Sequence, residues 1–154
     1  MANIAQSVNV ISPLMTTKSG IVKQTTWWPL LLFCKYMRGH TVAVNVRCGE
    51  YEGPTEPAWI RGTIETPWLD VSATLSDDGW VSLAVVNVHD SRDFEVELQG
   101  LNASEVSVYT VSGDNVNAVN VEDKEEVGIK ERKWDGKGAF TFTKHSVTML
   151  RWKA

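Results

Sequence analysis

From about residue 40 onward, apolar residues alternate with polar ones in short runs, and turn residues separate these runs. This alternation is typical of β-strands that bury one face. The runs at 69–75 and 80–86 are joined by Asp77-Asp78-Gly79, which is a strong hairpin signal. Further strands are expected at 42–48, 94–98, 106–111, 129–134, 140–142 and 145–152. Short strands at this turn-punctuated spacing predict a mainly β fold, an antiparallel β-sandwich of the jelly-roll type.

The first 39 residues follow a different pattern. Residues 28–37 show the period of a helix, with Pro29 in the first turn, where proline is tolerated, and Gly39 as a candidate C-cap. The apolar face of this helix is expected to hold Leu30, Leu31, Phe33, Cys34 and Met37. The pattern therefore divides the chain into a segment 1–39 and a β-domain 40–154. Within the β-domain, prolines make 49–67 mainly loop, and the charged run 122–126 is expected to be a solvated loop.

The composition excludes several partners. The net charge is −4 and no basic cluster exists, so nucleic acid is not an expected partner. The apolar run 30–33 is far too short to cross a membrane, and the first residues lack the features of a secretory signal. Cys34 and Cys48 are too few for a disulfide framework; buried free thiols are favoured over a bridge between them.

No motif in the chain assembles a catalytic or metal site. His40, His89 and His145 are scattered, and none has a Cys, His or carboxylate at ligand spacing, so neither a metal nor a cofactor is expected. Carboxylates are plentiful, but they fall mainly in turns and loops, and no spacing selects the facing pair that glycoside hydrolysis needs. The tripeptide Asn102-Ala103-Ser104 is an N-glycosylation sequon at an expected turn.

The chain contains seven tryptophans, which are Trp27, Trp28, Trp59, Trp68, Trp80, Trp134 and Trp152. Aromatic rings can stack on sugars, but they also fill sheet cores, and core packing is the favoured interpretation.

Specific stretches resemble α-L-arabinofuranosidases of glycoside hydrolase family 51. Residues 1–11 (MANIAQSVNVI), 13–16 (PLMT) and 24–30 (QTTWWPL) are similar to the last unit of the family's (β/α)₈ barrel. Residues 140–142 (FTF) and 145–151 (HSVTMLR) resemble the last strand of its β-sandwich, and 83–87 (LAVVN) matches in pattern. The resemblance implies that 1–39 is a strand, loop and helix remnant of the catalytic barrel and that 40–154 is the C-terminal sandwich.

The resemblance also implies where the chemistry lies. Family members release terminal α-L-arabinofuranosyl residues from arabinoxylan and arabinan with two barrel glutamates, and both precede the unit present here. No catalytic residue is therefore expected in this chain, which is expected to be inactive alone. Gln6 matches the family glutamine that binds arabinose from the end of the last barrel strand. Trp27 and Trp28 are expected either to border the sugar cleft or to pack at the helix start.

Three functions follow as hypotheses. The leading one is the accessory, stabilising part of a secreted α-L-arabinofuranosidase of L-arabinose metabolism, with its secretion signal in the missing N-terminal part. The second is a non-catalytic carbohydrate-binding module, which needs two coplanar, exposed tryptophans. The third is a purely structural module, in which the sandwich stabilises the barrel and supports homo-oligomer contacts. Without the barrel, the apolar face of the helix is expected to fold back on the sandwich, to meet another chain or to stay exposed.

Overall fold

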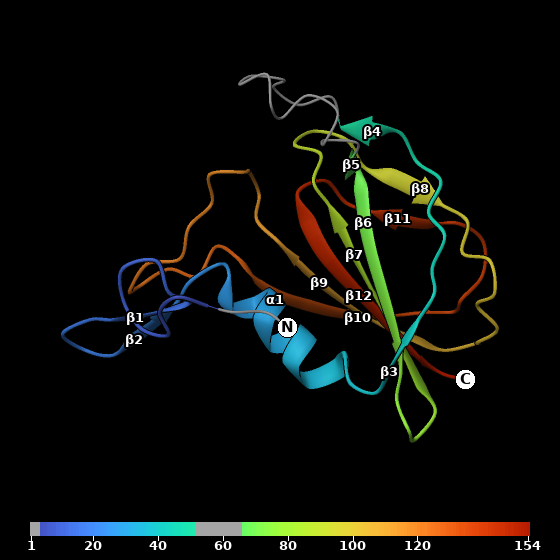
Figure 1. The fold of residues 1–154 in the computed structure, drawn as a ribbon. Helices are drawn as coiled ribbons and strands as arrows, with labels where there is room; N and C mark the ends of the chain where they lie inside the picture. Colours follow the sequence, from blue (N-terminus) through green and yellow to red (C-terminus); the bar gives the residue numbers. More distant parts are fainter. Residues whose placement is uncertain (1–3, 52–65) are drawn as a thin grey trace, which may run out of the picture.

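The computed structural model describes residues 4–51 and 66–154, and its centre is an antiparallel sheet of six strands in the order β10-β9-β12-β7-β6-β3 (Figure 1). The strands of this sheet are β3 (His40–Val42), β6 (Leu69–Leu75), β7 (Trp80–Asn87), β9 (Val106–Ser112), β10 (Gly128–Trp134) and β12 (Ser146–Lys153). The predicted hairpin at Asp77-Asp78-Gly79 joins β6 to β7. The mainly β, antiparallel fold expected from the alternation is confirmed.

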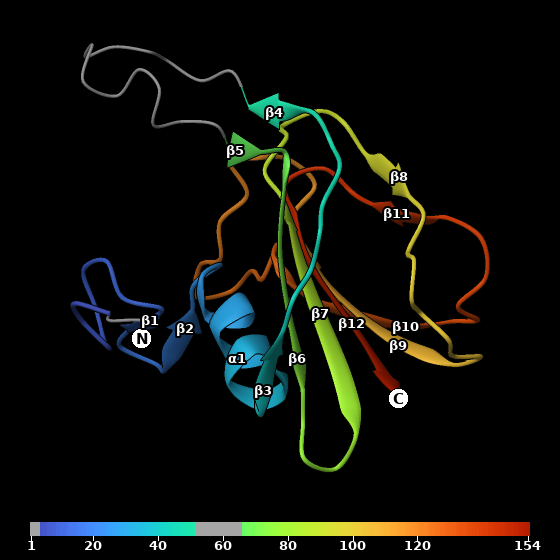
Figure 2. The ribbon, with the colours of Figure 1, turned by 45° about the vertical axis from the view of Figure 1, so that its right-hand side comes forward.

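A second, smaller layer lies across one face of this sheet. It consists of β8 (Phe94–Val96) paired with β11 (Phe140–Phe142), and of β4 (Glu50–Tyr51) paired with β5 (Thr66–Pro67). Figure 2 shows this layer on the side of the sheet opposite to the helix. The core between the layers contains the inward residues of the long strands and of β8 and β11: Leu69, Ala73, Leu83, Val85, Phe94, Val106, Val108, Phe140, Phe142, Leu150 and Trp152.

The other face of the sheet carries α1 (Trp27–Tyr36), the one helix in the described part of the chain. Its buried residue is Leu32, which packs with Ala84, Val111, Val127 and Met149 from the sheet and the adjoining loop. The predicted helix is confirmed, but its predicted face is only partly right. Phe33 and Met37 pack against this cluster, whereas Leu30, Leu31 and Cys34 are exposed and the buried Leu32 was not assigned to the face. Every position from Leu30 to Cys34 is apolar, so the period alone does not select which stripe faces the sheet.

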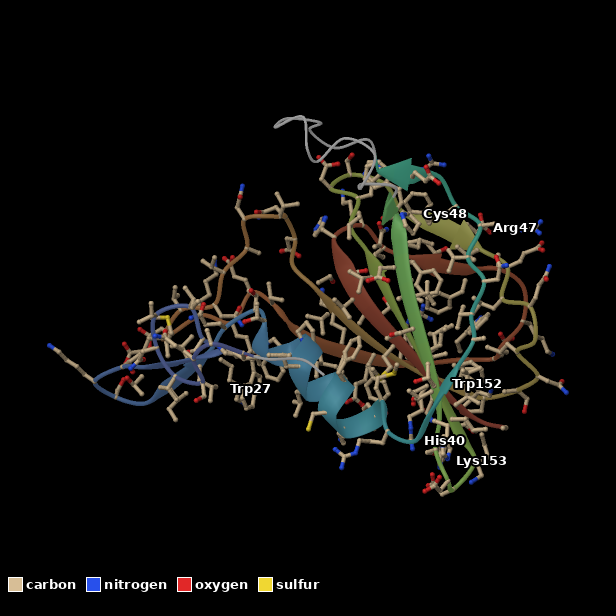
Figure 3. All side chains as sticks on the ribbon, in the orientation of Figure 1. Trp27, His40, Arg47, Cys48, Trp152 and Lys153 are labelled. Carbon is tan, nitrogen blue, oxygen red and sulfur yellow. The ribbon has the colours of Figure 1, made fainter. Side chains whose placement is uncertain are left out.

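The predicted strand 42–48 forms a ladder only at its beginning. β3 ends at Val42, and residues 43–49 run extended without a strand partner in the described part of the chain. Val46 and Cys48 still pack against the core and Arg47 points outward (Figure 3), so the alternation predicts the inward side chains correctly for the second half of this run. Val42 and Val44 remain exposed, because the second layer does not extend over them.

Gly39 joins the helix to the sheet at a position that no other residue fits easily. Its φ is +102°, and a Cβ built there would lie 2.3 Å from the carbonyl oxygen of Leu75. Glycine alone tolerates both the left-handed backbone and this approach. Since Met37 rather than Gly39 caps the helix, the predicted C-cap role becomes one of close packing against the end of β6.

Several expectations concern the remaining residues. Cys34 and Cys48 are both free, but Cys34 is exposed rather than buried, because it lies on the outer side of α1. Residues 1–3 of the N-terminal motif and most of the expected loop 49–67, with Trp59, lie outside the described residues. The described ends of that loop, at 50–51 and 66–67, form strands. In the described ranges, no helix has the length and apolar character needed to span a membrane.

A pair of tyrosines joins the helix to the sheet. The rings of Tyr36 and Tyr109 stack with centroids 4.9 Å apart, and their hydroxyls share a hydrogen bond of 3.2 Å. Burial, followed by the bond to Tyr36, raises the pKa of Tyr109 to about 12. Burial also acts to raise the pKa of Tyr36, but hydrogen bonds with Tyr109 and Lys35 outweigh it, so this pKa lies below its ordinary value.

This pair predicts a pH effect at the alkaline end. An unfolded tyrosine loses its proton near pH 10, whereas Tyr109 in the folded chain keeps its proton to about pH 12. Between these values the unfolded chain binds fewer protons, so the Tyr109 contribution to stability is lost as the pH rises. Ultraviolet titration of folded protein should show a phenolate step near pH 12, and this step should disappear in Tyr109→Phe. An unchanged step in that variant would contradict the assignment.

Candidate functional site

The glutamine expected to contact arabinose lies in an open segment. Gln6 is exposed and belongs to no strand, and no hydrogen bond of its side chain occurs within the described ranges. The expected last barrel strand is thus not formed around it; only a bridge between Val8 and Leu14 orders the neighbouring chain. A β-strand of a barrel needs neighbouring strands to satisfy its backbone groups, and the described residues supply none at this position.

A small hairpin follows this segment and was not predicted. Its strands are β1 (Leu14–Thr16) and β2 (Ile21–Lys23), and residues 17–20 connect them. Figure 1 shows the hairpin beside the start of α1, at one end of the molecule.

Polar contacts attach the hairpin to the loop that joins β9 to β10. The amide of Asn120 donates to the carbonyl oxygens of Lys23, at 2.9 Å, and Val127, at 2.8 Å. The Asn120 side-chain oxygen accepts from the backbone N–H groups of Glu126 and Val127. Glu122 accepts from the hydroxyls of Thr17 and Ser19. The charged run is exposed, as expected, but one of its carboxylates also holds the N-terminal segment.

The two tryptophans at the helix start have different surroundings. Trp27 is half-buried and lies on the side of α1 away from the sheet (Figure 3). Trp28 packs into the core between helix and sheet, with the Lys23 ammonium 5.1 Å from its ring centroid. Its indole Nε1 is buried without a hydrogen-bond partner among the described residues. Trp28 therefore has the packing role that was one of its two expected roles.

A cavity of about 320 Å³ opens beside the start of α1. Helix-start residues, the β9–β10 connection and the start of β12 line it, among them Thr26, Pro29, Asn115, Val116 and His145. His145 has a φ of +35°, and its ring nitrogens lie 3.2 Å and 3.1 Å from the carbonyl oxygens of Asp90 and Gly113. The ring thus joins two loops, and the cavity contains no nucleophile beside a base.

The carboxylates of the described ranges do not form an acid–base pair. Every Asp and Glu there is exposed. Where a carboxyl pKa departs from its ordinary range, it is lowered, chiefly by a hydrogen bond from a hydroxyl or an ammonium group. Ser76 donates to Asp78 and Ser91 to Asp90, whereas Lys133 donates to Glu105 and Lys124 to Glu126. A glycosidase acid needs a raised pKa, which burial normally provides. None of these groups has that environment.

The histidines and the sequon form no metal site: His40 and Asn102 are exposed, and His89 and His145 are half-buried in the described part of the chain. No group of three or more His, Cys, Asp or Glu in residues 4–51 and 66–154 could hold a metal ion. His40 faces the exposed Asp77, and the His89 ring lies tilted against that of Trp68, with ring centroids 4.3 Å apart. Asn102 is exposed in the loop before β9.

The tryptophans do not form a sugar-binding platform in the described part of the chain. Each one described there is half-buried or buried, and Trp152 is in the core. The carbohydrate-binding hypothesis requires two that are exposed and coplanar, so the packing interpretation is favoured.

Comparison with known proteins gives consistent matches. The sequence model of the family described as "Alpha-L-arabinofuranosidase C-terminal domain" matches residues 1–146. A probable α-L-arabinofuranosidase C of Aspergillus terreus is 64% identical over 154 residues, which are 100% of this chain and 30% of that protein. An exo-α-(1→6)-L-arabinofuranosidase of Bifidobacterium longum is 34% identical over 137 residues, covering 82% of this chain and 24% of that protein.

The fold also has a solved counterpart. The structure of an α-L-arabinofuranosidase from Thermotoga maritima, in complex with arabinose, matches with a TM-score of 0.82 and 24% identity. The match covers 97% of this chain and 33% of that one. The chain therefore spans about 30% of the length of the Aspergillus terreus relative.

Proposed function

This chain belongs to the family of α-L-arabinofuranosidase C-terminal domains, and from that premise we propose that it is the non-catalytic, stabilising part of a retaining α-L-arabinofuranosidase. The parent enzyme would release terminal α-L-arabinofuranosyl residues from arabinoxylan or arabinan. The observation that carries the proposal is the match of residues 1–146 to the family, together with the relatives' greater length. The exposure of every described carboxylate supports the absence of catalysis in this part.

We further propose that residues 1–39 are the last β/α unit of a catalytic barrel and that 40–154 are the accessory sandwich. Exposed apolar side chains support this division, because they gather in the N-terminal segment and on the outer side of α1: Ile4, Val8, Val10, Ile11, Ile21, Leu30 and Leu31. Such a group of exposed apolar side chains is typical of a surface that another part covers. The barrel of the parent enzyme is the proposed cover, and a second copy of the chain is the alternative.

Within this proposal Gln6 is the arabinose-binding residue of the intact enzyme. Its exposed side chain, with no hydrogen bond in the described ranges, is available to a sugar. Trp27, on the outer side of the helix start, is proposed to border the cleft, whereas the Trp28 ring is occupied by packing.

Activity provides the direct test. The purified chain should hydrolyse an aryl α-L-arabinofuranoside no faster than buffer, whereas a full-length enzyme that contains this sequence should turn it over. Adding a barrel fragment to the chain, at concentrations where they associate, should raise activity above that of either part. Turnover by the chain alone, abolished by changing one of its own carboxylates, would refute the proposal.

The parent enzyme is also proposed to be secreted, which would make Asn102 available for N-glycosylation. Asn102 is exposed and lies in a loop, where a glycan meets no packed surface. Expression through a eukaryotic secretory pathway should give a product whose mass falls on endoglycosidase treatment. Asn102→Gln should remove that difference, and a glycan retained in this variant would place the modification elsewhere.

A further inference from the structure

A row of cations and aromatic rings runs along the helix-bearing face of the sheet from the C-terminal end of α1. Its members are Lys35 and Tyr36 of α1, Arg151 and Lys153 of β12, and Trp80 of β7. The Arg151 guanidinium carbon lies 4.0 Å from the Trp80 ring centroid and 5.0 Å from that of Tyr36. The Lys35 ammonium lies 4.9 Å from the Tyr36 centroid, and that of Lys153 lies 5.6 Å from the Trp80 centroid. We call these five residues the cation–aromatic row.

Two rings from different elements restrict the guanidinium of Arg151. An arginine side chain normally has many rotamers, and binding a ligand costs the free energy of ordering them. Here Tyr36 and Trp80 already limit this motion, and Arg151 is half-buried. Tyr36 is in turn held by its stack and hydrogen bond with Tyr109. The group is therefore preorganised before any ligand arrives.

The N–H groups of Arg151 have no acceptor in the described ranges. No hydrogen bond from its side chain occurs there, and none of the ion pairs found there includes it. Asp78 and Glu131 are the carboxylates in electrostatic range of the row, but neither bonds Arg151. Lys153 donates to the backbone carbonyl of Asp78. The row thus has three cations and only two carboxylates nearby. The Arg151 guanidinium, which is the planar donor among the three cations, makes no hydrogen bond in the described ranges.

We propose that Arg151 is a binding site for the carboxylate of a small ligand. A guanidinium presents parallel N–H groups that match a carboxylate in a two-point hydrogen bond. Lys35 and Lys153 at the ends of the row add attraction, and the edges of Tyr36 and Trp80 offer apolar contact to the body of the ligand. A sugar acid and an amino-acid side chain both carry this group. The proposal is independent of the role of the chain in the parent enzyme.

Two other arginines provide matched controls. Arg132 lies 4.9 Å from the Phe140 centroid and Arg92 lies 4.8 Å from the Phe94 centroid, and each contacts a single ring. Each has an exposed side chain. They share the charge and the aromatic contact of Arg151 but not the second ring or the flanking lysines.

The test is an NMR titration of the full 154-residue chain, which follows the arginine Nε–H signals at constant ionic strength. Sodium glucuronate, N-acetylglutamate and uncharged glucose are the three probes. The Arg151 signal, assigned by its loss in Arg151→Lys, should shift saturably with glucuronate at millimolar concentration and should not shift with glucose. Amide spectra of each variant confirm that it is folded.

The variants determine whether the two-point hydrogen bond of the Arg151 guanidinium contributes to the affinity. Arg151→Lys keeps the charge, so binding that is roughly tenfold weaker would identify the two-point contact. Arg132→Lys should bind like the unchanged chain. Tighter binding of glucuronate than of N-acetylglutamate would identify a sugar acid as the ligand source, and the reverse order would identify an acidic side chain. Failure of both acids to saturate the signal, or equal binding by Arg151→Lys, would overturn the proposal.

Discussion

Replacement of Asn87 by leucine is expected to lower the free energy of unfolding by about 3 kcal/mol or more. Asn87 is 1% exposed, and its amide nitrogen lies 3.0, 3.1 and 3.0 Å from the carbonyl oxygens of Arg92, Phe142 and Thr143. Its side-chain oxygen accepts from the N–H of His89. Leucine has a similar volume but leaves these backbone groups without their partner, and each buried, unpaired group costs about 1 to 3 kcal/mol.

Denaturant unfolding followed by circular dichroism measures this loss. Asn117→Leu is the control, because Asn117 is exposed and such substitutions usually change stability by less than about 0.5 kcal/mol. If both variants unfold at the same denaturant concentration, the amide does not hold the end of β7 to the two segments that it contacts.

Leu32→Ala is the second substitution with a large expected effect, a loss of about 2 to 5 kcal/mol. Leu32 is 2% exposed and is the residue of α1 that is fully enclosed against the sheet. Removal of the Leu32 side chain leaves a cavity between the helix and strands β7, β9 and β12. The closely packed strands cannot move far enough to fill it. The loss should be visible as a lower unfolding midpoint with an unchanged slope.

Leu31→Ala is the matched control, because it removes the same atoms one position away. Leu31 is 37% exposed, so the isolated chain should lose less than about 1 kcal/mol. In a full-length enzyme, Leu31→Ala should cost more stability than Leu32→Ala only if a barrel covers Leu31. Comparing the two variants there therefore also tests that contact. Equal losses in the isolated chain would mean that the helix does not pack as described.

The strands could be predicted because their signal is local. Alternation and an Asp-Gly turn specify β6, β7 and their hairpin within about twenty residues, and these elements occur where they were expected. Residues 43–49 show the limit of this signal. Alternation reports which side chains point inward, and it did so for Val46 and Cys48, but a ladder also needs a neighbouring strand, which the local sequence does not specify.

The helix shows a different limit. Its position was predicted to within two residues, because Pro29, the apolar run and Gly39 mark it. Its buried face was predicted only in part. Phe33 and Met37 pack as expected, but Leu32 was not assigned to that face, because a run of apolar residues has no contrast between the sides of the helix. The sheet selects Leu32, and only the arrangement of β7, β9 and β12 defines that choice.

Residues that connect distant segments were missed for the same reason. Three side chains contact backbone groups that lie far away in the sequence. Asn87 donates to the carbonyl oxygen of Phe142 and Asn120 to that of Lys23. The His145 ring lies against the carbonyl oxygens of Asp90 and Gly113. A polar residue at the end of an apolar strand was the available signal, and it also fits an ordinary turn residue. Gln6 was identified from a family motif, and nothing in its own surroundings would have singled it out.

The strand order has a consequence for how the molecule forms during synthesis. β12 is the last strand described and lies between β7 and β9, where it supplies both halves of the sheet with their shared neighbour. Until the ribosome has released residues 146–153, the β3-β6-β7 half and the β9-β10 half each have an edge strand without a partner. The sheet can therefore close only late, through contacts of long sequence separation, which is the slow and aggregation-exposed route to a β-fold.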